Sequence, residues 1–326
     1  MANPVAGTDS VPATGMPERY ATGGSGVSVD HWPARLRELG YPDAVPIGAG
    51  MDGGVYALDD ARVAKVWWDR TPGRLAALAE AYEELAGAGL PFATPRIERI
   101  VTVSGRTVSV ERRLTGMPLS DAGADGYDQA VSVLAALGTV TAGPALAALP
   151  VLGEATSPWW PGARWGAMLS ALLARRMSRH AGQLRAAVPG FDRLLAGTYR
   201  WLDTLPTTPT GVLHGDLCPP NVLVDRYGRV TALLDWGLLT TRGDPAFDAG
   251  TFAGFFDMYS PRAREHADAT LTAIERRLGY PRELLLAYRG YYALIGANLY
   301  DPAGADGHFG WCVATLTDPA VRAALS

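Results

Sequence analysis

Three polar side chains, Asp216, Asn221 and Asp235, stand at intervals that suit chemistry on a phosphate group. The pattern is His-x-Asp, four residues, Asn, an apolar run, a turn, a second apolar run and Asp-x-Gly. The runs 222–224 and 230–234 are rich in β-forming residues, and Tyr227-Gly228 between them predicts a hairpin turn. In phosphoryl transfer, one carboxylate accepts the proton of the attacking hydroxyl, while an amide oxygen and a second carboxylate hold magnesium. The pattern therefore predicts a phosphoryl-transfer site at one edge of a rigid hairpin.

The spacing resembles the catalytic loop and the Asp-x-Gly metal motif of protein kinases. Gly215 directly follows His214, and Trp236 stands where protein kinases carry Phe, so the stretch is more similar to the aminoglycoside phosphotransferase family of small-molecule kinases. The chain has no Ala-Pro-Glu segment after Gly237, which disfavours protein-kinase activity.

This resemblance implies a role for each polar residue of the stretch. Asp216 would be the catalytic base, and Asn221 and Asp235 would be the magnesium ligands. His214 would support the loop rather than react. Magnesium and a nucleoside triphosphate, ATP or GTP, are therefore the expected cofactor and co-substrate.

A second constellation precedes this stretch and contains the only lysine of the chain. Of the 29 basic residues, 28 are arginine and one is Lys65. A lone ammonium among guanidinium groups indicates a task that needs a compact charge on a flexible stem, such as reaching phosphate oxygens. Lys65 follows Val63-Ala64 on a predicted strand, as in the Val-Ala-x-Lys pattern of kinases.

A glycine-rich loop lies between the two predicted strands before Lys65. Gly48, Gly50 and Gly53 are its candidate nucleotide-binding residues, because glycine lets backbone amides approach a phosphate without a Cβ in the way. The loop is not a Walker A motif, since no Gly-Lys-Ser/Thr opens a helix. We therefore expect a strand, loop, strand, turn and strand across residues 45–68.

The resemblance adds two nucleotide-site candidates beyond the glycine loop and Lys65. In the family, the helix after the lysine strand carries a glutamate that pairs with the lysine. The helix predicted over 72–86 offers Glu80, Glu83 and Glu84, and Glu80 is our choice. Glu111 is the second candidate, as the start of a linker whose backbone groups would meet the purine.

The fold expected from these motifs is α+β and bilobal, like that of protein kinases. We expect a weakly ordered tail over 1–28, an N-lobe with a small antiparallel sheet over 29–114, and a mainly helical C-lobe over 115–326, with the nucleotide between the lobes. The helical periodicity predicts elements at 31–39 and 72–86 and then along the C-lobe, near 127–142, 163–187, 191–204, 245–258, 262–278, 281–299 and 308–324.

The overall composition excludes several other classes of protein. A net charge of −4 argues against binding to nucleic acid. Two cysteines give neither a disulfide framework nor a zinc pattern, and Cys218 is interpreted as a filler residue. The uncharged run 130–153 contains prolines and glycines, so we interpret it as a buried helix followed by a short element rather than a membrane span. With no signal peptide apparent, we expect a cytoplasmic protein without membrane partners.

The acceptor half of the site carries no comparable motif. A cationic antibiotic or amino sugar would need carboxylates, and the candidates are Asp248, Asp257, Asp301 and Asp306. A macrolide or another apolar, glycosylated substrate would need aromatic residues; the candidates are Phe252, Phe255, Phe256, Tyr259, Tyr288, Tyr291 and Tyr292. Asp244 is interpreted as a structural helix cap, and the aromatic loop at 157–162 as core or cleft wall.

The sequence therefore predicts a kinase that transfers the γ-phosphoryl group of ATP or GTP to a hydroxyl of a small molecule. An antibiotic is the leading acceptor, in resistance or in self-protection during biosynthesis. A metabolite kinase acting on choline, homoserine or a sugar is one alternative. A catalytically silent nucleotide-binding protein on the same fold is another, although its catalytic set would be expected to be damaged.

Overall fold

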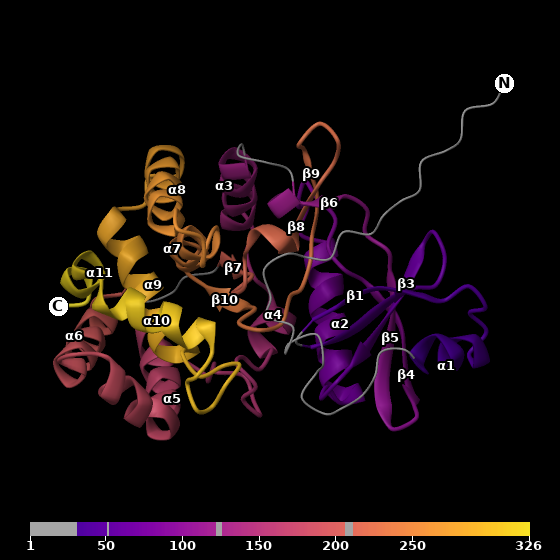
Figure 1. The fold of residues 1–326 in the computed structure, drawn as a ribbon, viewed down its shortest axis with the longest axis horizontal. Helices are drawn as coiled ribbons and strands as arrows, with labels where there is room; N and C mark the ends of the chain where they lie inside the picture. The colour runs from indigo at the N-terminus through magenta and orange to yellow at the C-terminus, as the bar shows by residue number, and fades with distance from the viewer. Residues whose placement is uncertain (1–30, 51, 122–125, 206–210) are drawn as a thin grey trace. The chain divides into compact units, whose positions relative to one another are not determined.

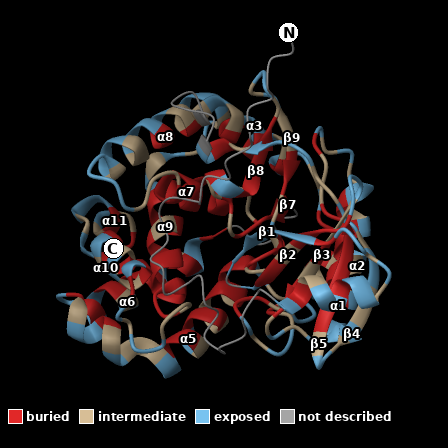
Figure 2. Ribbon diagram, turned by 45° about the vertical axis from the view of Figure 1, so that its right-hand side comes forward, coloured by how far each residue is buried: buried red, intermediate tan, exposed pale blue. Residues whose placement is uncertain are grey.

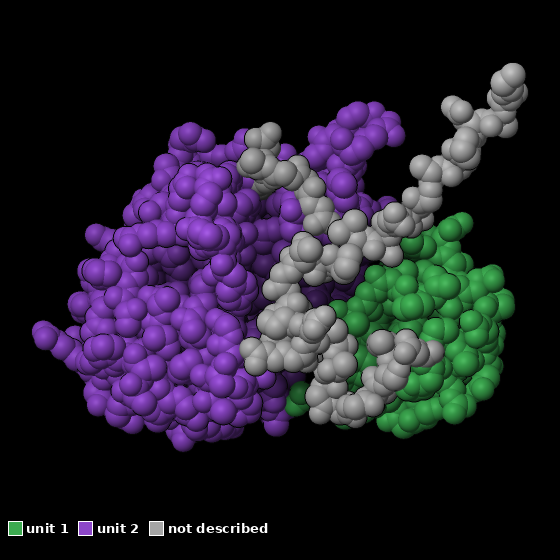
Figure 3. All heavy atoms as spheres, in the orientation of Figure 1, with its two compact units in different colours: residues 1–75, 97–113 green, residues 76–96, 114–326 purple. Residues whose placement is uncertain are grey.

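A computed structural model describes residues 31–50, 52–121, 126–205 and 211–326 of the chain. Its contacts divide the chain into two compact units, coloured separately in Figure 3. The first unit comprises Met1–Leu75 and Ile97–Arg113, and the second comprises Ala76–Arg96 and Leu114–Ser326. The predicted tail over 1–28 lies outside the described residues, and the domain limits at 29, 114 and 115 stay predictions.

The first unit is built on one antiparallel sheet with the strand order β1-β2-β3-β5-β4. The strands are β1 (Val45–Ala49), β2 (Gly53–Ala57), β3 (Arg62–Trp67), β4 (Ile97–Val103) and β5 (Arg106–Arg112). Lys65 on β3 lies opposite Val55 of β2 and Ser109 of β5. The predicted strand, loop, strand, turn and strand is therefore present, with Lys65 on the central strand of the sheet.

The two faces of this sheet differ in chemistry because side chains alternate along each strand. One face is apolar and packs on helix α1 (Trp32–Glu38), with Trp32, Leu36, Tyr56 and Val66 in its core. The other face carries Lys65, Trp67, Ser109 and Glu111. At the edge of the sheet, all five residues of β1 are exposed (Figure 2).

The second unit contains two small sheets. Strands β6 (Met117–Pro118), β8 (Val222–Val224) and β9 (Val230–Leu233) form one, and β7 (Gly211–Leu213) pairs with β10 (Thr241–Gly243) in the other. The predicted hairpin is confirmed: β8 pairs with β9 in antiparallel register, and Gly228 takes the left-handed conformation (φ 75°) in the turn. A short helix η4 (Pro219–Asn221) leads from the loop that carries Asp216 into β8.

Helices make up most of the second unit (Figure 1). α2 (Pro72–Ala86) begins in the first unit, and η3 (Leu119–Asp121) follows β6. The others, in chain order, are α3 (Gly126–Gly138), α4 (Pro144–Ala148), α5 (Trp165–Ala187), α6 (Phe191–Thr204), α7 (Ala246–Phe255), α8 (Ala263–Leu278), α9 (Arg282–Gly296), α10 (Gly307–Thr317) and α11 (Pro319–Ala324). Every residue of α7 is buried, whereas much of α8 is exposed (Figure 2). α7 is therefore an internal support of this unit.

The predicted α+β fold, with a small antiparallel sheet and a larger helical part, is confirmed. Several predicted helix boundaries were wrong, and two of them are instructive. The helix predicted over 308–324 is two helices, because Asp318 caps α11 by accepting N–H bonds from Ala320 and Val321, and Pro319 begins α11. The helix predicted over 127–142 ends at Gly138. Among the described helices, none combines the length and the apolar character needed to cross a bilayer.

Candidate active site

The loop that carries Asp216 is held through its backbone N–H groups by a buried carboxylate. The Asp248 carboxylate, on the buried helix α7, accepts the His214 N–H at 2.6 Å and the Gly215 N–H at 2.9 Å. Burial raises the pKa of Asp248 to about 7, and the two N–H bonds act in the opposite direction. Gly215 has a φ of 79°, and a Cβ there would lie 2.3 Å from Leu239, so only glycine fits between the anchor and Asp216.

The His214 ring connects the loop to the end of the hairpin. Burial lowers the pKa of His214 to about 4, so the ring is neutral near pH 7. Its Nδ1 accepts the Asp216 N–H at 3.2 Å, which leaves Nε2 to carry the proton and to donate to the Leu234 carbonyl at 2.7 Å. This agrees with the predicted supporting role, because both ring nitrogens are committed to backbone groups next to Asp216 and Asp235.

Asn221 completes the link between the two aspartates. Its Nδ2 donates to the Asp216 carbonyl at 2.9 Å, and its own carbonyl accepts the Leu234 N–H at 2.8 Å. Desolvation raises the pKa of the half-buried Cys218 thiol, and the charges of Asp216 and Asp235 raise it further, so both carboxylates lie within electrostatic reach of one atom. The structure therefore brings together the three polar residues that the sequence singles out.

The donor set of Asn221 and Asp235 fits a magnesium ion. Because the Asn221 Nδ2 is committed to a carbonyl, the amide oxygen is the group left to bind a cation. Asp235 adopts a left-handed backbone with φ 60°, which is rare for a residue other than glycine and clusters at functional sites. One or two side-chain oxygens together with substrate phosphates is the usual way in which proteins hold magnesium. Within the described residues, no group of three or more His, Cys, Asp or Glu forms a self-sufficient metal site.

In the first unit, the glycine-rich loop divides into open and packed positions. A Cβ added to Gly48 or Gly50 would meet nothing within 4 Å, so the space beside both α-carbons is open. The Gly50 N–H itself donates to the Gly53 carbonyl at 2.9 Å. A Cβ on Gly53 would lie 2.1 Å from the Val66 carbonyl oxygen. Gly53 is therefore required by the close packing of β2 on β3, a requirement separate from any phosphate.

Two of the three α2 glutamates have structural partners in the second unit. Glu84 accepts the N–H groups of Gly143 and Ala145 at 2.6 and 2.8 Å, so it caps the N-terminus of α4. Glu83 forms an ion pair with Arg96 at 2.7 Å. Glu80, on the same helix, is exposed, and its pairing with Lys65 stays a prediction.

The prediction that Glu111 begins a linker was wrong. It lies inside β5, opposite Val63 of β3 and Ile97 of β4, so strands flank it on both sides. Its side chain is buried and accepts the Ser109 hydroxyl. Glu111 thus contributes to the polar face of the sheet.

The acceptor candidates are largely engaged in structure. The candidate Asp248 does not face a substrate. It is only 2% exposed and anchors the loop that carries Asp216. Asp257 binds His266 and the turn at Ser260, and Asp301 accepts N–H bonds within its own loop. Asp306 caps α10 through one oxygen, and its other oxygen is buried.

The aromatic candidates are mostly core residues, as their helical spacing indicated. Phe252, Phe255, Tyr288, Tyr291 and Tyr292 are buried, whereas Phe256 is half-buried and Tyr259 is exposed. In a separate contact, the Tyr288 hydroxyl donates to Asp244 at 2.7 Å. Asp244 also caps α7, which agrees with its predicted structural role.

Two further features lie outside the predicted acceptor set. Trp159 of the aromatic loop donates to the Thr241 hydroxyl at 3.0 Å, whereas the neighbouring Trp160 is exposed.

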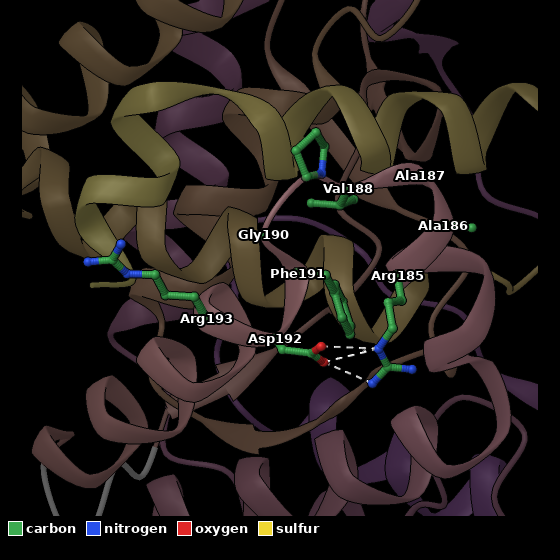
Figure 4. A pocket seen from close by; sticks show the side chains of 9 residues that line it. Arg185, Ala186, Ala187, Val188, Gly190, Phe191, Asp192 and Arg193 are labelled. Atoms are coloured by element: carbon green, nitrogen blue, oxygen red, sulfur yellow. Dashed lines mark hydrogen bonds and ion pairs between the residues drawn. The ribbon is translucent and has the colours of Figure 1, made fainter.

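A surface hollow of about 290 Å³ is lined by residues 185–193, with the Arg185–Asp192 ion pair across it (Figure 4). No residue of the predicted nucleotide, metal or catalytic set lines this hollow.

The chain belongs to the phosphotransferase enzyme family, whose model matches residues 43–286. Viomycin phosphotransferase of Streptomyces vinaceus is 31% identical over 188 residues, which are 55% of this chain and 61% of that protein. The uncharacterized protein YcbJ of Bacillus subtilis (strain 168) is 45% identical over 51 residues, 15% of this chain and 16% of that protein. The matched segments thus span less than two thirds of the length of both curated relatives.

Solved structures show the same fold across nearly their whole length. A thermostable variant of aminoglycoside phosphotransferase APH(4)-Ia, in a ternary complex with ADP and hygromycin B, has a TM-score of 0.62 and 19% identity over 88% of this chain and 98% of that chain. Macrolide 2'-phosphotransferase MphH of Brachybacterium faecium has a TM-score of 0.56 and 21% identity over 89% of this chain and 99% of that chain. The predicted family and its kinase-like fold are confirmed.

Proposed function

We propose that this protein transfers the γ-phosphoryl group of ATP or GTP to a hydroxyl of a small molecule, with an antibiotic as the leading acceptor. One observation carries the proposal: a single network of hydrogen bonds between side chains and backbone groups starts at the buried Asp248. It reaches Asp216 and Asn221, and through the His214 ring it reaches Leu234, the residue before Asp235. Family membership supports the reaction class.

Asp216 is the proposed catalytic base. Its carboxylate accepts the proton of the acceptor hydroxyl as the oxygen of that hydroxyl forms a bond to the γ-phosphorus. The bond from the γ-phosphorus to the bridging oxygen breaks, and the nucleoside diphosphate leaves with that oxygen. The loop contributes by fixing the carboxylate, because its backbone is tied to Asp248 and Asn221 before substrate arrives.

Asn221 and Asp235 are the proposed magnesium ligands. Magnesium, when bound, neutralises charge on the phosphate oxygens and orients them for in-line transfer. In the first unit, Lys65 and the glycine-rich loop at Gly48 and Gly50 are the proposed phosphate contacts, with Glu80 as the partner of Lys65. Solved relatives bound to ADP or to AMP-PNP support an adenine nucleotide as the first to test.

The acceptor is proposed to be an antibiotic on the strength of the relatives. Viomycin heads the panel because the relative at 31% identity is named for it. Hygromycin B, streptomycin and gentamicin follow, because solved relatives were studied in complex with them. A macrolide, choline, homoserine and simple sugars complete the panel and cover the other acceptor classes.

The test incubates the protein with magnesium, ATP or GTP and each acceptor, and mass spectrometry then searches for a phosphorylated acceptor and an equal amount of nucleoside diphosphate. We expect one antibiotic to yield both products, and Asp216→Asn, run alongside, to yield neither at a comparable rate. A phosphorylated metabolite would move the acceptor class to metabolism. Tight nucleotide binding without transfer to any acceptor would identify a silent nucleotide-binding protein and contradict the proposal.

A further inference from the structure

The only lysine of the chain lies on the face of a buried tryptophan. The Lys65 ammonium is 4.1 Å from the centroid of the Trp67 ring. The two residues are two positions apart on β3, so strand alternation places both on the polar face of the sheet. A tryptophan face is the strongest aromatic partner for a cation, and its attraction grows when water is excluded. Trp67 is only 1% exposed, so this contact lies on the sheltered side of the lysine.

A hydrogen-bond chain fixes the orientation of that ring. The Trp67 Nε1–H donates to the Ser109 hydroxyl at 2.8 Å, and the Ser109 hydroxyl donates to the Glu111 carboxylate. Ser109 is completely buried and lies opposite Lys65 on β5, and Glu111 lies two residues further on the same face. A buried indole N–H without an acceptor would be costly, so Ser109 and Glu111 give the ring one preferred orientation.

The same strand end also holds the glycine-rich loop. Arg70 stacks on the Trp67 ring at 4.7 Å and forms an ion pair with Asp52 in the loop at 2.9 Å. The neighbouring Trp68 donates its backbone N–H to the Asp52 carbonyl at 2.9 Å and its indole N–H to the Gly50 carbonyl at 3.3 Å. Both proposed phosphate-binding elements are therefore connected to two adjacent tryptophans.

We infer that Trp67 is a positioning residue for Lys65. Its indole, oriented by Ser109 and Glu111, holds the ammonium of Lys65 in place for the nucleotide phosphates, while Trp68 holds the glycine loop through its own hydrogen bonds to Asp52 and Gly50. The inference rests on the proposed function for its consequence in catalysis. The contact between Lys65 and Trp67 itself can be tested without turnover.

Acylation of the lysine amine reports on this contact directly. Because Lys65 is the only lysine, one peptide in a mass-spectrometric digest carries the whole signal, and the N-terminal amine maps to another peptide. Replacing Trp67 removes the ring face that stabilises the protonated ammonium of Lys65, so a larger fraction of Lys65 is present as the reactive free amine. We expect Trp67→Leu to be acylated about three to ten times faster than wild type at fixed pH.

Two further variants separate positioning from general disturbance of the unit. Ser109→Ala keeps the indole but removes its acceptor, and we expect a smaller acceleration of the same sign. Trp68→Leu changes the neighbouring ring and the Gly50 contact, and we expect wild-type acylation of Lys65. Circular dichroism is used to check that each variant is folded. If Trp67→Leu does not fold, the acylation rate of Ser109→Ala decides the test.

Nucleotide affinity, measured by calorimetry, gives the functional half of the test. We expect Trp67→Leu to weaken magnesium–nucleotide binding about tenfold in the wild-type background and to add almost nothing in a Lys65→Met background. An equal loss in both backgrounds, or wild-type acylation in folded Trp67→Leu and Ser109→Ala, would overturn the inference. Absence of nucleotide binding by the wild type would instead contradict the proposed function, and the acylation rates would still decide the role of Trp67.

Discussion

The two units position their key charged groups in different ways. In the second unit, Asp216 is held through its backbone, since Asp248, Asn221 and the His214 ring all bind main-chain groups of the loop. In the first unit, Lys65 rests on a side chain, the Trp67 indole. Backbone anchoring fixes the position of the Asp216 carboxylate, which would suit the proposed catalytic base. Side-chain support leaves the Lys65 stem flexible, which would suit the proposed contact with phosphates.

The comparison leads to a difference in tolerance to mutation. A change at a backbone anchor leaves buried N–H groups without acceptors and disturbs the whole loop. A change at the side-chain support shifts one cation and leaves the sheet register intact. We therefore expect substitutions in the catalytic loop and its anchor to have large effects, and substitutions around Lys65 to have graded effects.

Asp216→Asn should have the largest effect on rate. The amide keeps the size of the carboxylate but cannot accept the proton, and a positioned general base typically contributes ~10²–10⁴-fold. We expect kcat to fall by about that factor in a steady-state assay with the identified acceptor. A variant with near-wild-type kcat would remove Asp216 from the role of base.

Asp248→Asn should come next, and it probes the backbone anchor. An amide can accept only one of the two N–H bonds, and each unsatisfied buried donor costs about 1–3 kcal/mol. We expect a loss of stability of that size in urea unfolding, together with a clear fall in kcat. The matched control is Asp192→Asn, an exposed ion-pair residue, which should change neither. Equal behaviour of the two variants would contradict the anchoring role.

Lys65→Arg should have a smaller, graded effect. Charge is kept, but a planar guanidinium replaces a compact ammonium above the Trp67 ring. We expect kcat/KM for the nucleotide to fall about ten- to a hundredfold, or roughly 1.4–2.8 kcal/mol, with an unchanged melting temperature. Wild-type kinetics in this variant would show that the only lysine is retained for another reason.

The smallest effect on turnover is expected at the buried His308 of α10, where the change falls on stability. Burial lowers the pKa of His308 from 6.5 to about 4. Because the pKa of His308 is lower in the folded chain than in the unfolded chain, the unfolded chain binds a proton at a higher pH. The free energy of unfolding therefore keeps its full value above pH 6.5 and decreases as the pH falls toward 4. The loss amounts to about 3 kcal/mol at the acid end.

We expect His308→Gln to flatten this acid slope in urea titrations between pH 7 and pH 4. His31→Gln, at an exposed position before α1, is the control and should keep the wild-type slope. A slope unchanged by His308→Gln would assign the acid sensitivity to other groups.

The sequence predicted what local spacing determines. The hairpin and the strand that carries Lys65 follow from turn chemistry and alternation within short segments, whereas the roles of Asp216, Asn221 and Asp235 are implied by the resemblance of their spacing to a known family. The break at Asp318-Pro319 also has a local signal, a capping residue followed by proline. Trp67 could have been found in the same way, since it lies two residues after Lys65 on a predicted strand.

Contacts between distant segments could not be predicted in this way. Asp248 lies 34 residues beyond His214, and its role depends on how α7 packs beneath the loop. Glu84 caps α4 from 59 residues away, which the periodicity of α2 does not encode. The same limit applies to the acceptor site, because most acidic and aromatic candidates have structural partners that only the folded chain reveals.

The central claim is that Asp216 acts on the acceptor, whereas Asp235 binds the metal of the nucleotide. The most direct test is a calorimetric titration of wild type, Asp216→Asn and Asp235→Asn with ATP at two magnesium concentrations. We predict that Asp216→Asn binds like wild type, while Asp235→Asn binds more weakly and recovers partly at high magnesium. Weak binding by Asp216→Asn together with normal binding by Asp235→Asn would reverse the two roles and contradict the account.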